Sequence, residues 1–205
     1  MKWEEKRLRI EVCGGIASGK TTLAALCREA GFSVRNERFQ ENPFFEKFYA
    51  DPNAYAFEAE LTYLLQHFSQ SREAASEPRL AVDFSLALDL AYARVTLQDV
   101  DQSAFDSLLT RIIEKIGLPA LIVRLECPTD IELSRIQRRN RAVEQRIAAP
   151  FLGALNSQIE LALGSPPFST VPICRIDSST LDFRPEGKDR HQVLERVMAA
   201  TGVAR

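Results

Sequence analysis

The chain has 205 residues, enough for one domain with a sizeable core, and we treat residues 1–205 as a single domain. Its formal net charge of −2 gives no general attraction to a phosphate backbone, so a nucleic-acid polymer is not an expected partner. No apolar stretch approaches the length of a membrane span, and no signal-peptide core follows the charged start. The four cysteines lie far apart, without metal or redox spacing. We therefore expect a cytoplasmic protein with reduced, buried thiols and no membrane partner.

The first half of the chain alternates short apolar runs with segments of helical spacing. In chain order we predict a strand, a helix ending before Gly31, a second strand, a long helix and a third strand, over Leu8–Cys13, Lys20–Ala30, Ser33–Asn36, Ala54–Ala75 and Leu80–Val82. A shorter helix is predicted before the long one, with Asn42 as its N-cap and Pro43 at its first position.

The second half continues the alternation. We predict two helices, the most apolar strand, a further helix, a last strand and a closing helix, over Leu88–Leu97, Phe105–Ile116, Ala120–Leu125, Phe151–Leu163, Val171–Ile176 and Gln192–Ala200. Between the fourth strand and the helix after it, Thr129 and Glu132 form the pattern of a capping box that starts an arginine-rich helix. Long connections that each contain helix predict an α/β fold, with a five-stranded parallel sheet covered by helices on both faces.

A phosphate-binding loop is predicted directly after the first strand. The run from Gly14 to Thr21 matches G-x-x-x-x-G-K-[ST], with a strand before it and a helix after it. In such loops backbone N–H groups surround the β-phosphate, the lysine neutralises the β- and γ-phosphates, and the hydroxyl holds Mg²⁺. The residues expected to bind ATP are Gly14, Gly15, Ile16, Ala17, Ser18, Gly19, Lys20, Thr21 and Thr22.

Two carboxylates follow predicted strands at the edge where ligands gather in sheets of this class, Glu37 after the second strand and Asp83 after the third. In-line phosphoryl transfer needs a group that orients or deprotonates the acceptor hydroxyl, and a carboxylate near the metal. We predict Glu37 as the base and Asp83, together with Thr21, as the metal-side ligand. By spacing alone, either acid is equally a solvated residue at a strand end.

The arginine-rich helix carries Arg135, Arg138, Arg139 and Arg141 within seven residues, with Arg135 and Arg139 on one face. Several guanidinium groups on one face suit the charge that develops on a transferred phosphoryl group. We predict a mobile arginine-rich lid at about residues 135–148, with Arg135, Arg139 and Arg141 in catalytic roles beside Lys20. The alternative is a solvated basic face, which the presence of a phosphate loop makes the weaker interpretation.

Beyond these patterns, the sequence resembles the deoxynucleoside kinases, particularly the bacterial deoxyadenosine and deoxyguanosine kinases. The resemblance runs from Ile10 to about Val197, and its most specific part is the Glu-Asn-Pro-Phe segment that leads into Lys-Phe-Tyr at residues 41–49. It is carried by the phosphate loop, Glu37, Glu41–Tyr49, Asp51-Pro52, Leu61–Gln70, Ala81–Ser85, Leu121–Arg141 and Leu181–Phe183.

The resemblance implies transfer of a phosphoryl group from ATP, with Mg²⁺, to the 5′-hydroxyl of a deoxynucleoside, in a homodimer that serves nucleotide salvage. It also implies site residues. Glu37 matches the general base, Tyr49 and Glu144 match a pair that grips the sugar 3′-hydroxyl, and Asp83 matches the acid that opens an Asp-Arg-Ser motif. Glu60 falls where a glutamine reads the base, and Asp89 falls on another acid of the base pocket. Arg135, Arg139 and Arg141 match the lid arginines.

Four positions depart from the pattern of the family. Phe84 replaces the motif arginine, His67 replaces an arginine that often lines the base pocket, Ala17 replaces a frequent loop glycine, and Glu60 replaces the base-reading glutamine. An ionised glutamate only accepts hydrogen bonds, and guanine offers two adjacent donors. We therefore predict a purine deoxynucleoside as acceptor, with a tilt towards deoxyguanosine, unless Glu60 points elsewhere, for instance to His67 on the same helix face.

Two other functions stay open at this point. A kinase with another small acceptor would share the phosphate loop, although Tyr49 and Glu144 suit a free 3′-hydroxyl. A nucleotide-binding protein without catalysis would fit the departures at Phe84, His67 and Glu60, although Lys20, Thr21, Glu37 and Asp83 are all retained.

Overall fold

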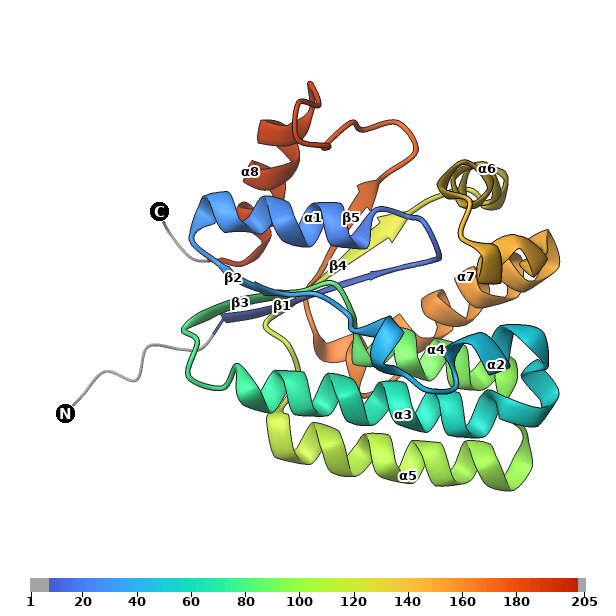
Figure 1. Ribbon diagram of the computed structural model, residues 1–205. Coiled ribbons are helices and arrows are strands. Elements are labelled where there is room, and N and C mark those ends of the chain that lie inside the picture. The colour runs from blue at the N-terminus through green and yellow to red at the C-terminus, as the bar shows by residue number, and fades with distance from the viewer. Residues whose placement is uncertain (1–7, 203–205) are drawn as a thin grey trace.

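A computed structural model describes residues 8–202 (Figure 1). Within them lies a sheet of five parallel strands, as predicted, and the order of the strands is β2-β3-β1-β4-β5. The strands are β1 (Leu8–Gly14), β2 (Ser33–Arg35), β3 (Arg79–Val82), β4 (Leu121–Glu126) and β5 (Ile173–Asp177). The charged start analysed in the sequence lies mostly in residues 1–7, outside the described residues.

The central strand β1 places the phosphate loop. It pairs with β3 on one side, where Ile10 is opposite Ala81, and with β4 on the other, where Ile10 is opposite Leu121. The chain order of the strands reverses on either side of β1, and ligands of open parallel sheets bind at such a switch point, beyond the carboxyl ends of the strands. The loop that begins at Gly14 leaves β1 at that edge.

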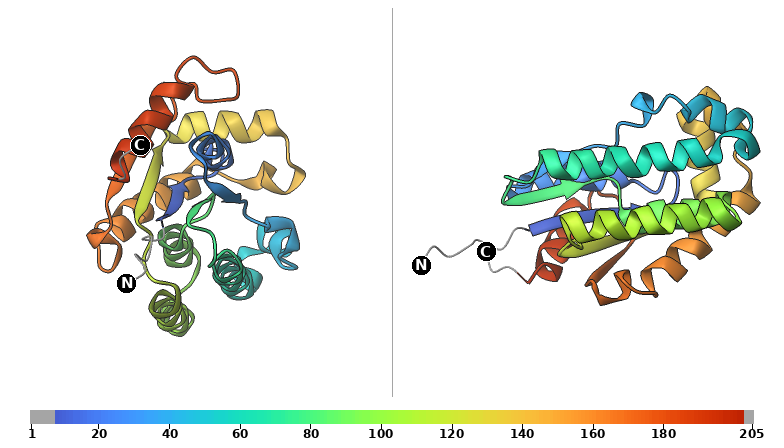
Figure 2. Two further views of the ribbon diagram at one scale, coloured as in Figure 1. Left: turned by 90° about the vertical axis from the view of Figure 1, so that its left-hand side faces the viewer. Right: turned by 90° about the horizontal axis from the view of Figure 1, so that it is seen from below.

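Helices cover both faces of the sheet, which confirms the predicted architecture (Figures 1 and 2). One face carries α1 (Lys20–Leu26) and α8 (Arg190–Ala200), and the other carries α3 (Pro52–Glu73), α4 (Leu86–Thr96), α5 (Asp99–Ile116) and α7 (Ala149–Leu163). The remaining helices are α2 (Phe45–Ala50) and α6 (Thr129–Arg139), and the 3₁₀ turns are η1 (Cys27–Ala30), η2 (Phe39–Glu41), η3 (Ala142–Arg146) and η4 (Phe168–Thr170).

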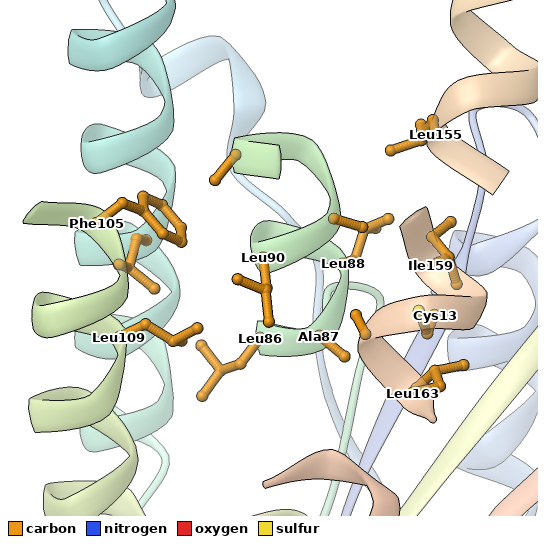
Figure 3. Close-up of a cluster of buried hydrophobic side chains, with 14 of the residues drawn as sticks. Cys13, Leu86, Ala87, Leu88, Leu90, Phe105, Leu109, Leu155, Ile159 and Leu163 are labelled. Atoms are coloured by element: carbon orange, nitrogen blue, oxygen red, sulfur yellow. The ribbon is translucent and has the colours of Figure 1, made fainter. Parts of the chain in front are cut away.

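Helix α4 is the centre of the larger core, because it is packed between α5 and α7 (Figure 3). Leu86 and Leu90 face α5, where Leu86 lies against Leu109, and the opposite side of α4 meets α7 at Ile159. Each buried leucine of this kind stabilises the fold by about 1.5–3 kcal/mol. The helix is therefore held rigidly, and so are the polar side chains that it presents to the carboxyl ends of the strands.

The predicted capping box at Thr129 is wrong. Helix α6 begins at Thr129 itself, its N-cap is Pro128, and no side chain caps it. Glu132 is fully buried and accepts a hydrogen bond of 2.8 Å from Asn156 of α7 instead. A glutamate at this position can cap the start of the helix only if its side chain faces solvent. The Thr-x-x-Glu pattern does not determine whether the side chain faces solvent or the core.

The predicted helix start at Asn42 is also wrong. Asn42 is buried, its Oδ1 accepts from the backbone N–H of Phe44 at 2.9 Å, and its Nδ2 donates to the carbonyl of Ala59 at 3.1 Å. Helix α2 therefore begins at Phe45, and Asn42 ties the preceding turn to α3. The long helix α3 begins at Pro52, earlier than expected, because Asp51 accepts from the N–H of Ala54 and caps it.

Two further predictions from the sequence concern the state of the cysteines and membrane-spanning segments. All four cysteines are buried and free, as predicted, and burial raises the pKa of the Cys13 and Cys27 thiols to about 12. Among residues 8–202, no helix is both long and apolar enough to cross a membrane.

Candidate active site

The phosphate loop has the geometry that its glycines predict. Gly19 has φ 104°, a left-handed conformation that glycine adopts without steric cost, and α1 starts at the next residue. The Nζ of Lys20 donates to the carbonyls of Gly14 and Gly15, at 2.9 Å each, so the lysine lies across the loop mouth. Ala17 also has a positive φ, 61°, which costs an alanine roughly 1–2 kcal/mol.

Glu37 and Asp83 meet beside this loop, as the sequence predicts. The backbone N–H of Glu37 donates to Oδ1 of Asp83, which joins the ends of β2 and β3. Burial raises the pKa of the Asp83 carboxyl, and hydrogen bonds from Thr21 and from Glu37 only partly offset the rise. Asp83 is nearly inaccessible, whereas the Glu37 side chain is 33% exposed.

His67 lies between Glu37 and Asp89 of α4. Its Nδ1 is 2.9 Å from Oδ2 of Asp89, and its Nε2 is 3.5 Å from Oε1 of Glu37. Its ring stacks on Phe84, with centroids 4.1 Å apart and planes 2° from parallel. The two departures from the family pattern, Phe84 and His67, thus form one packed unit.

The charges of this unit are strongly coupled. Burial alone would lower the pKa of His67, but the charge and hydrogen bond of Asp89, together with Glu37, raise it to about 10. Burial would raise the pKa of Glu37, but His67, Lys20 and Arg141 lower it. Glu37 is therefore an ionised carboxylate at neutral pH, a charge state suited to a base.

Glu60 contacts neither His67 nor any other basic side chain by an ion pair within residues 8–202. Its Oε1 lies 3.2 Å from the hydroxyl of Thr96 on α4. Burial, followed by the charge of Asp89, raises the pKa of Glu60 to about 8. The predicted tilt towards deoxyguanosine assumed an ionised glutamate, whereas this raised pKa favours the protonated form of Glu60 near neutral pH.

Arg135, Arg139 and Arg141 line one cavity with the phosphate loop, and two of them bind Glu144. Oε2 of this buried carboxylate accepts from Arg139 at 2.6 Å, and Oε1 accepts from Arg141 at 3.3 Å. Arg135 donates to the carbonyl of Ala17 at 3.3 Å. Arg138 is exposed and takes no part. Helix α6 ends at Asn140, whose φ of 52° is left-handed, so Arg141 lies beyond the helix.

One cavity of about 570 Å³ unites these groups, a size within the range of small-molecule binding sites. His67, Gly14, Gly15 and Ser18, although predicted as site residues, lie outside its lining. The cavity is lined by Ile16, Ala17, Gly19, Lys20, Thr21, Thr22, Asn36, Glu37, Phe39, Phe45, Phe48, Tyr49, Glu60, Tyr63, Asp83, Leu88, Asp89, Tyr92, Arg135, Arg139, Arg141 and Glu144.

Comparison with known protein families matches residues 10–201 to the family described as deoxynucleoside kinase. The chain belongs to the deoxynucleoside kinase family. Its relatives include a deoxyguanosine kinase of Bacillus subtilis (strain 168), 27% identical, with 75% of this chain and 77% of that protein covered. A deoxyguanosine kinase of Lactobacillus johnsonii is also 27% identical, over 93% of this chain and 91% of that protein.

Solved structures agree on the fold of this deoxynucleoside kinase. A deoxyadenosine kinase from M. mycoides with bound dCTP superimposes with a TM-score of 0.78 over 95% of this chain and 99% of that chain, at 21% identity. The same enzyme with bound dATP gives a TM-score of 0.78 over 96% of this chain and 100% of that chain.

Several residues of the cavity lining were not predicted from the sequence. Tyr63 and Tyr92 line the cavity, and each stands three residues after a predicted site residue, Glu60 and Asp89 respectively. Residues three apart share a helix face, so this spacing was a usable signal. Phe45 and Phe48 also line the cavity. Thr96 gave no signal, because its role depends on how α3 and α4 pack.

Proposed function

We propose that this kinase transfers the γ-phosphoryl group of ATP to the 5′-hydroxyl of a purine deoxynucleoside. The observation that carries the proposal is that one cavity contains both the phosphate loop, at Lys20 and Thr21, and a buried pocket of acids and tyrosines at Glu60, Asp89 and Tyr92. Glu37 lines the same cavity, where its N–H donates to Asp83 beside the phosphate loop and its carboxylate is oriented by His67 from behind. A phosphate site and a nucleoside-sized pocket that share one carboxylate suit transfer between two bound substrates.

On the donor side, the amides that open α1 and the ammonium of Lys20 bind the phosphates of the donor. Lys20 exchanges its bonds to the Gly14 and Gly15 carbonyls for phosphate oxygens. Arg135, Arg139 and Arg141 line the same cavity and stabilise the charge on the transferred group. Movement of residues 135–148 as a lid would bring them over it.

On the acceptor side, the ionised carboxylate of Glu37 takes the proton from the 5′-hydroxyl. As that oxygen forms its bond to the γ-phosphorus, the bond from the γ-phosphorus to the bridging oxygen breaks, and the diphosphate leaves with the electron pair. Tyr49 and Glu144, both in the cavity wall, hold the 3′-hydroxyl of the sugar. Asp89 fixes His67, and His67 holds Glu37 ionised.

The residues present fit Mg²⁺, which prefers few protein ligands and shares its shell with water and phosphate oxygens. The hydroxyl of Thr21 and the carboxylate of Asp83 are the two groups that would hold it, and both line the cavity. When bound, the ion neutralises charge on the phosphates of the donor.

The cellular setting of the proposal is nucleotide salvage in the cytoplasm, by a homodimer. Family membership supports this setting, and the deoxyguanosine and deoxyadenosine kinases among the relatives support a purine acceptor.

The test is ATP consumption by the purified protein with Mg²⁺ on the four deoxynucleosides, on their monophosphates and without acceptor. The proposal expects turnover on purine deoxynucleosides and none on monophosphates. Turnover on monophosphates alone would assign another acceptor, and ATP binding without turnover on any acceptor would indicate a non-catalytic nucleotide binder. The dimer is tested separately by sedimentation.

A further inference from the structure

Glu60 is a buried carboxyl group in a surrounding of negative charge. It is 4% exposed and lies in the cavity wall. The ionisable groups that face it are the acids Asp89 of α4 and Glu37 after β2, the imidazolium of His67, and the phenols Tyr49, Tyr63 and Tyr92. The one cation in this set, His67, is already paired with both Asp89 and Glu37. An ionised Glu60 would therefore be a third carboxylate beside one imidazolium.

The hydrogen bonds of the Thr96 hydroxyl also indicate a protonated Glu60. The Thr96 hydroxyl lies 2.9 Å from the carbonyl of Tyr92 and 3.2 Å from Oε1 of Glu60. It has a single hydrogen, and a carbonyl can only accept. If that hydrogen goes to the nearer carbonyl, the contact with Glu60 is a hydrogen bond only when Glu60 supplies the second hydrogen. A neutral carboxyl satisfies both contacts, and a carboxylate satisfies one.

The environment supports a proton on Glu60 at neutral pH. Burial is the first cause and the charge of Asp89 the second, and together they raise the pKa of Glu60 to about 8. The other oxygen, Oε2, has no hydrogen-bond partner among the residues that the structure describes. Rotation of the Thr96 hydroxyl lets Oε2 act either as an O–H donor or as a carbonyl-like acceptor towards the cavity.

We propose that Glu60 reads the base of the nucleoside as an uncharged carboxylic acid, so that ionisation of this one residue changes the base preference of the kinase. A neutral carboxyl offers one donor and one acceptor, as a glutamine does. Adenine complements it with an amino donor beside a ring nitrogen, and guanine with a carbonyl oxygen beside a ring N–H. The neutral form therefore accepts both purines. The ionised form offers two acceptors, which match the ring N–H and amino group of guanine and repel the ring nitrogen of adenine.

The reading of the base by Glu60 rests on the proposed function, whereas the protonation of Glu60 does not. The experiment therefore has two arms. Both arms compare the wild type with Glu60→Gln, which has a fixed donor and acceptor, and with Glu58→Gln. Glu58 stands two residues earlier on α3 and is exposed, so this variant makes the same substitution without touching the cavity.

The first arm measures the melting temperature between pH 5 and pH 9 without ligand. Because the folded-state pKa is raised, folded Glu60 keeps its proton from pH 4.5 to about 8 while the unfolded chain releases it. Stability from this group therefore falls as pH rises through that window. The melting temperature of Glu60→Gln minus that of the wild type should therefore increase by about 5 °C or more from pH 5 to pH 9. The difference in melting temperature between Glu58→Gln and the wild type should stay constant. A constant difference between Glu60→Gln and the wild type would overturn the uncharged carboxyl.

The second arm measures the ratio of kcat/KM for deoxyadenosine to that for deoxyguanosine, in which pH effects common to both substrates cancel. In the wild type and in Glu58→Gln the ratio should fall about tenfold between pH 6.5 and pH 9, as one hydrogen bond is lost. In Glu60→Gln it should stay constant. A constant wild-type ratio would overturn the base reading. No turnover on any deoxynucleoside would overturn the proposed function and the base reading with it, while the first arm still decides the charge of Glu60.

Discussion

The carboxyl group of Glu132 occupies the space beside Gly15 that a side chain there would need. A Cβ built on Gly15 would lie 2.0 Å from Oε1 of Glu132. Glu132 is fully buried and bonded to Asn156, and burial raises its pKa to about 7. The glycine is thus required by a neighbour on α6 and not by a positive φ, since its backbone is outside the left-handed region.

Gly15→Ala should therefore displace Glu132, break its bond to Asn156 and destabilise the fold by about 1–3 kcal/mol. Urea denaturation measures the loss, and ATP affinity should fall because the loop moves. The double variant Gly15→Ala with Glu132→Ala removes the steric conflict and should recover part of both losses. If the double variant loses more stability than the two single variants lose together, Glu132 is not the group in conflict.

Glu37→Gln should lower kcat by about 10²–10⁴, the usual contribution of a general base, because an amide cannot take the proton of the 5′-hydroxyl. ATP affinity should stay unchanged, since the phosphate contacts of Lys20 and the loop remain. Steady-state kinetics and ATP titration measure the two effects. Glu41→Gln is the matched control, because Glu41 is an exposed acid four residues further on. An unchanged kcat in Glu37→Gln would remove Glu37 from this role.

The parts of the site that lie at strand ends were predictable from the sequence. Lys20, Glu37 and Asp83 each follow a strand whose apolar run is visible in the sequence, and parallel strands bring their carboxyl ends to one edge. The five strands were predicted for the same reason, with boundaries that differ by at most two residues.

The parts that depend on how helices pack were not predictable. The distance between Glu60 and Thr96 is set by the packing of α3 on α4, and no local pattern encodes it. The partner of Glu132 was missed because the Thr-x-x-Glu pattern suits a cap and a buried acid equally. Likewise, two arginines predicted to face the phosphate also bind Glu144, because helix α6 ends at a left-handed Asn140 and turns Arg141 back.

His67→Leu should destabilise the protein by about 3–5 kcal/mol at pH 7, because it leaves Asp89 and Glu37 without their buried cation. The raised pKa of about 10 means that the stabilisation by His67 is fully present below pH 6.5 and is lost as pH rises through 10. The difference between wild type and variant should therefore shrink from pH 7 to pH 10.5. His191→Leu is the control, since His191 is exposed on α8. A difference that is constant over this range would mean that His67 stabilises by packing on Phe84 alone.

Ala17→Gly should stabilise the protein by about 0.5–1 kcal/mol, because it relieves a left-handed alanine in the phosphate loop. The gain is limited by the greater freedom that glycine gives the unfolded chain. Thermal and urea unfolding measure it, with Ala54→Gly, in the first turn of α3, as a control that should lose stability. Loss of stability in Ala17→Gly would show that the loop carries no strain at this position.

Tyr49→Phe should affect only acceptors that carry a 3′-hydroxyl, if Tyr49 and Glu144 grip that group together. Burial raises the pKa of the Tyr49 phenol, with the charge of Glu144 the next cause, so the phenol is a neutral donor over the whole working range of pH. Loss of one hydrogen bond to the sugar should lower kcat/KM for deoxyadenosine about tenfold. The value for 2′,3′-dideoxyadenosine should not change.

Tyr55→Phe is the matched control for this variant, because Tyr55 lies on α3 outside the cavity lining and should leave both values unchanged. Equal losses of Tyr49→Phe on the two nucleosides would mean that the phenol supports the pocket without touching the sugar. The ring of Tyr49 packs edge-on against Phe45 and Phe48, at 5.3 Å between centroids in each case, and Tyr49→Phe preserves those contacts. The comparison therefore isolates the hydroxyl from the packing of the ring.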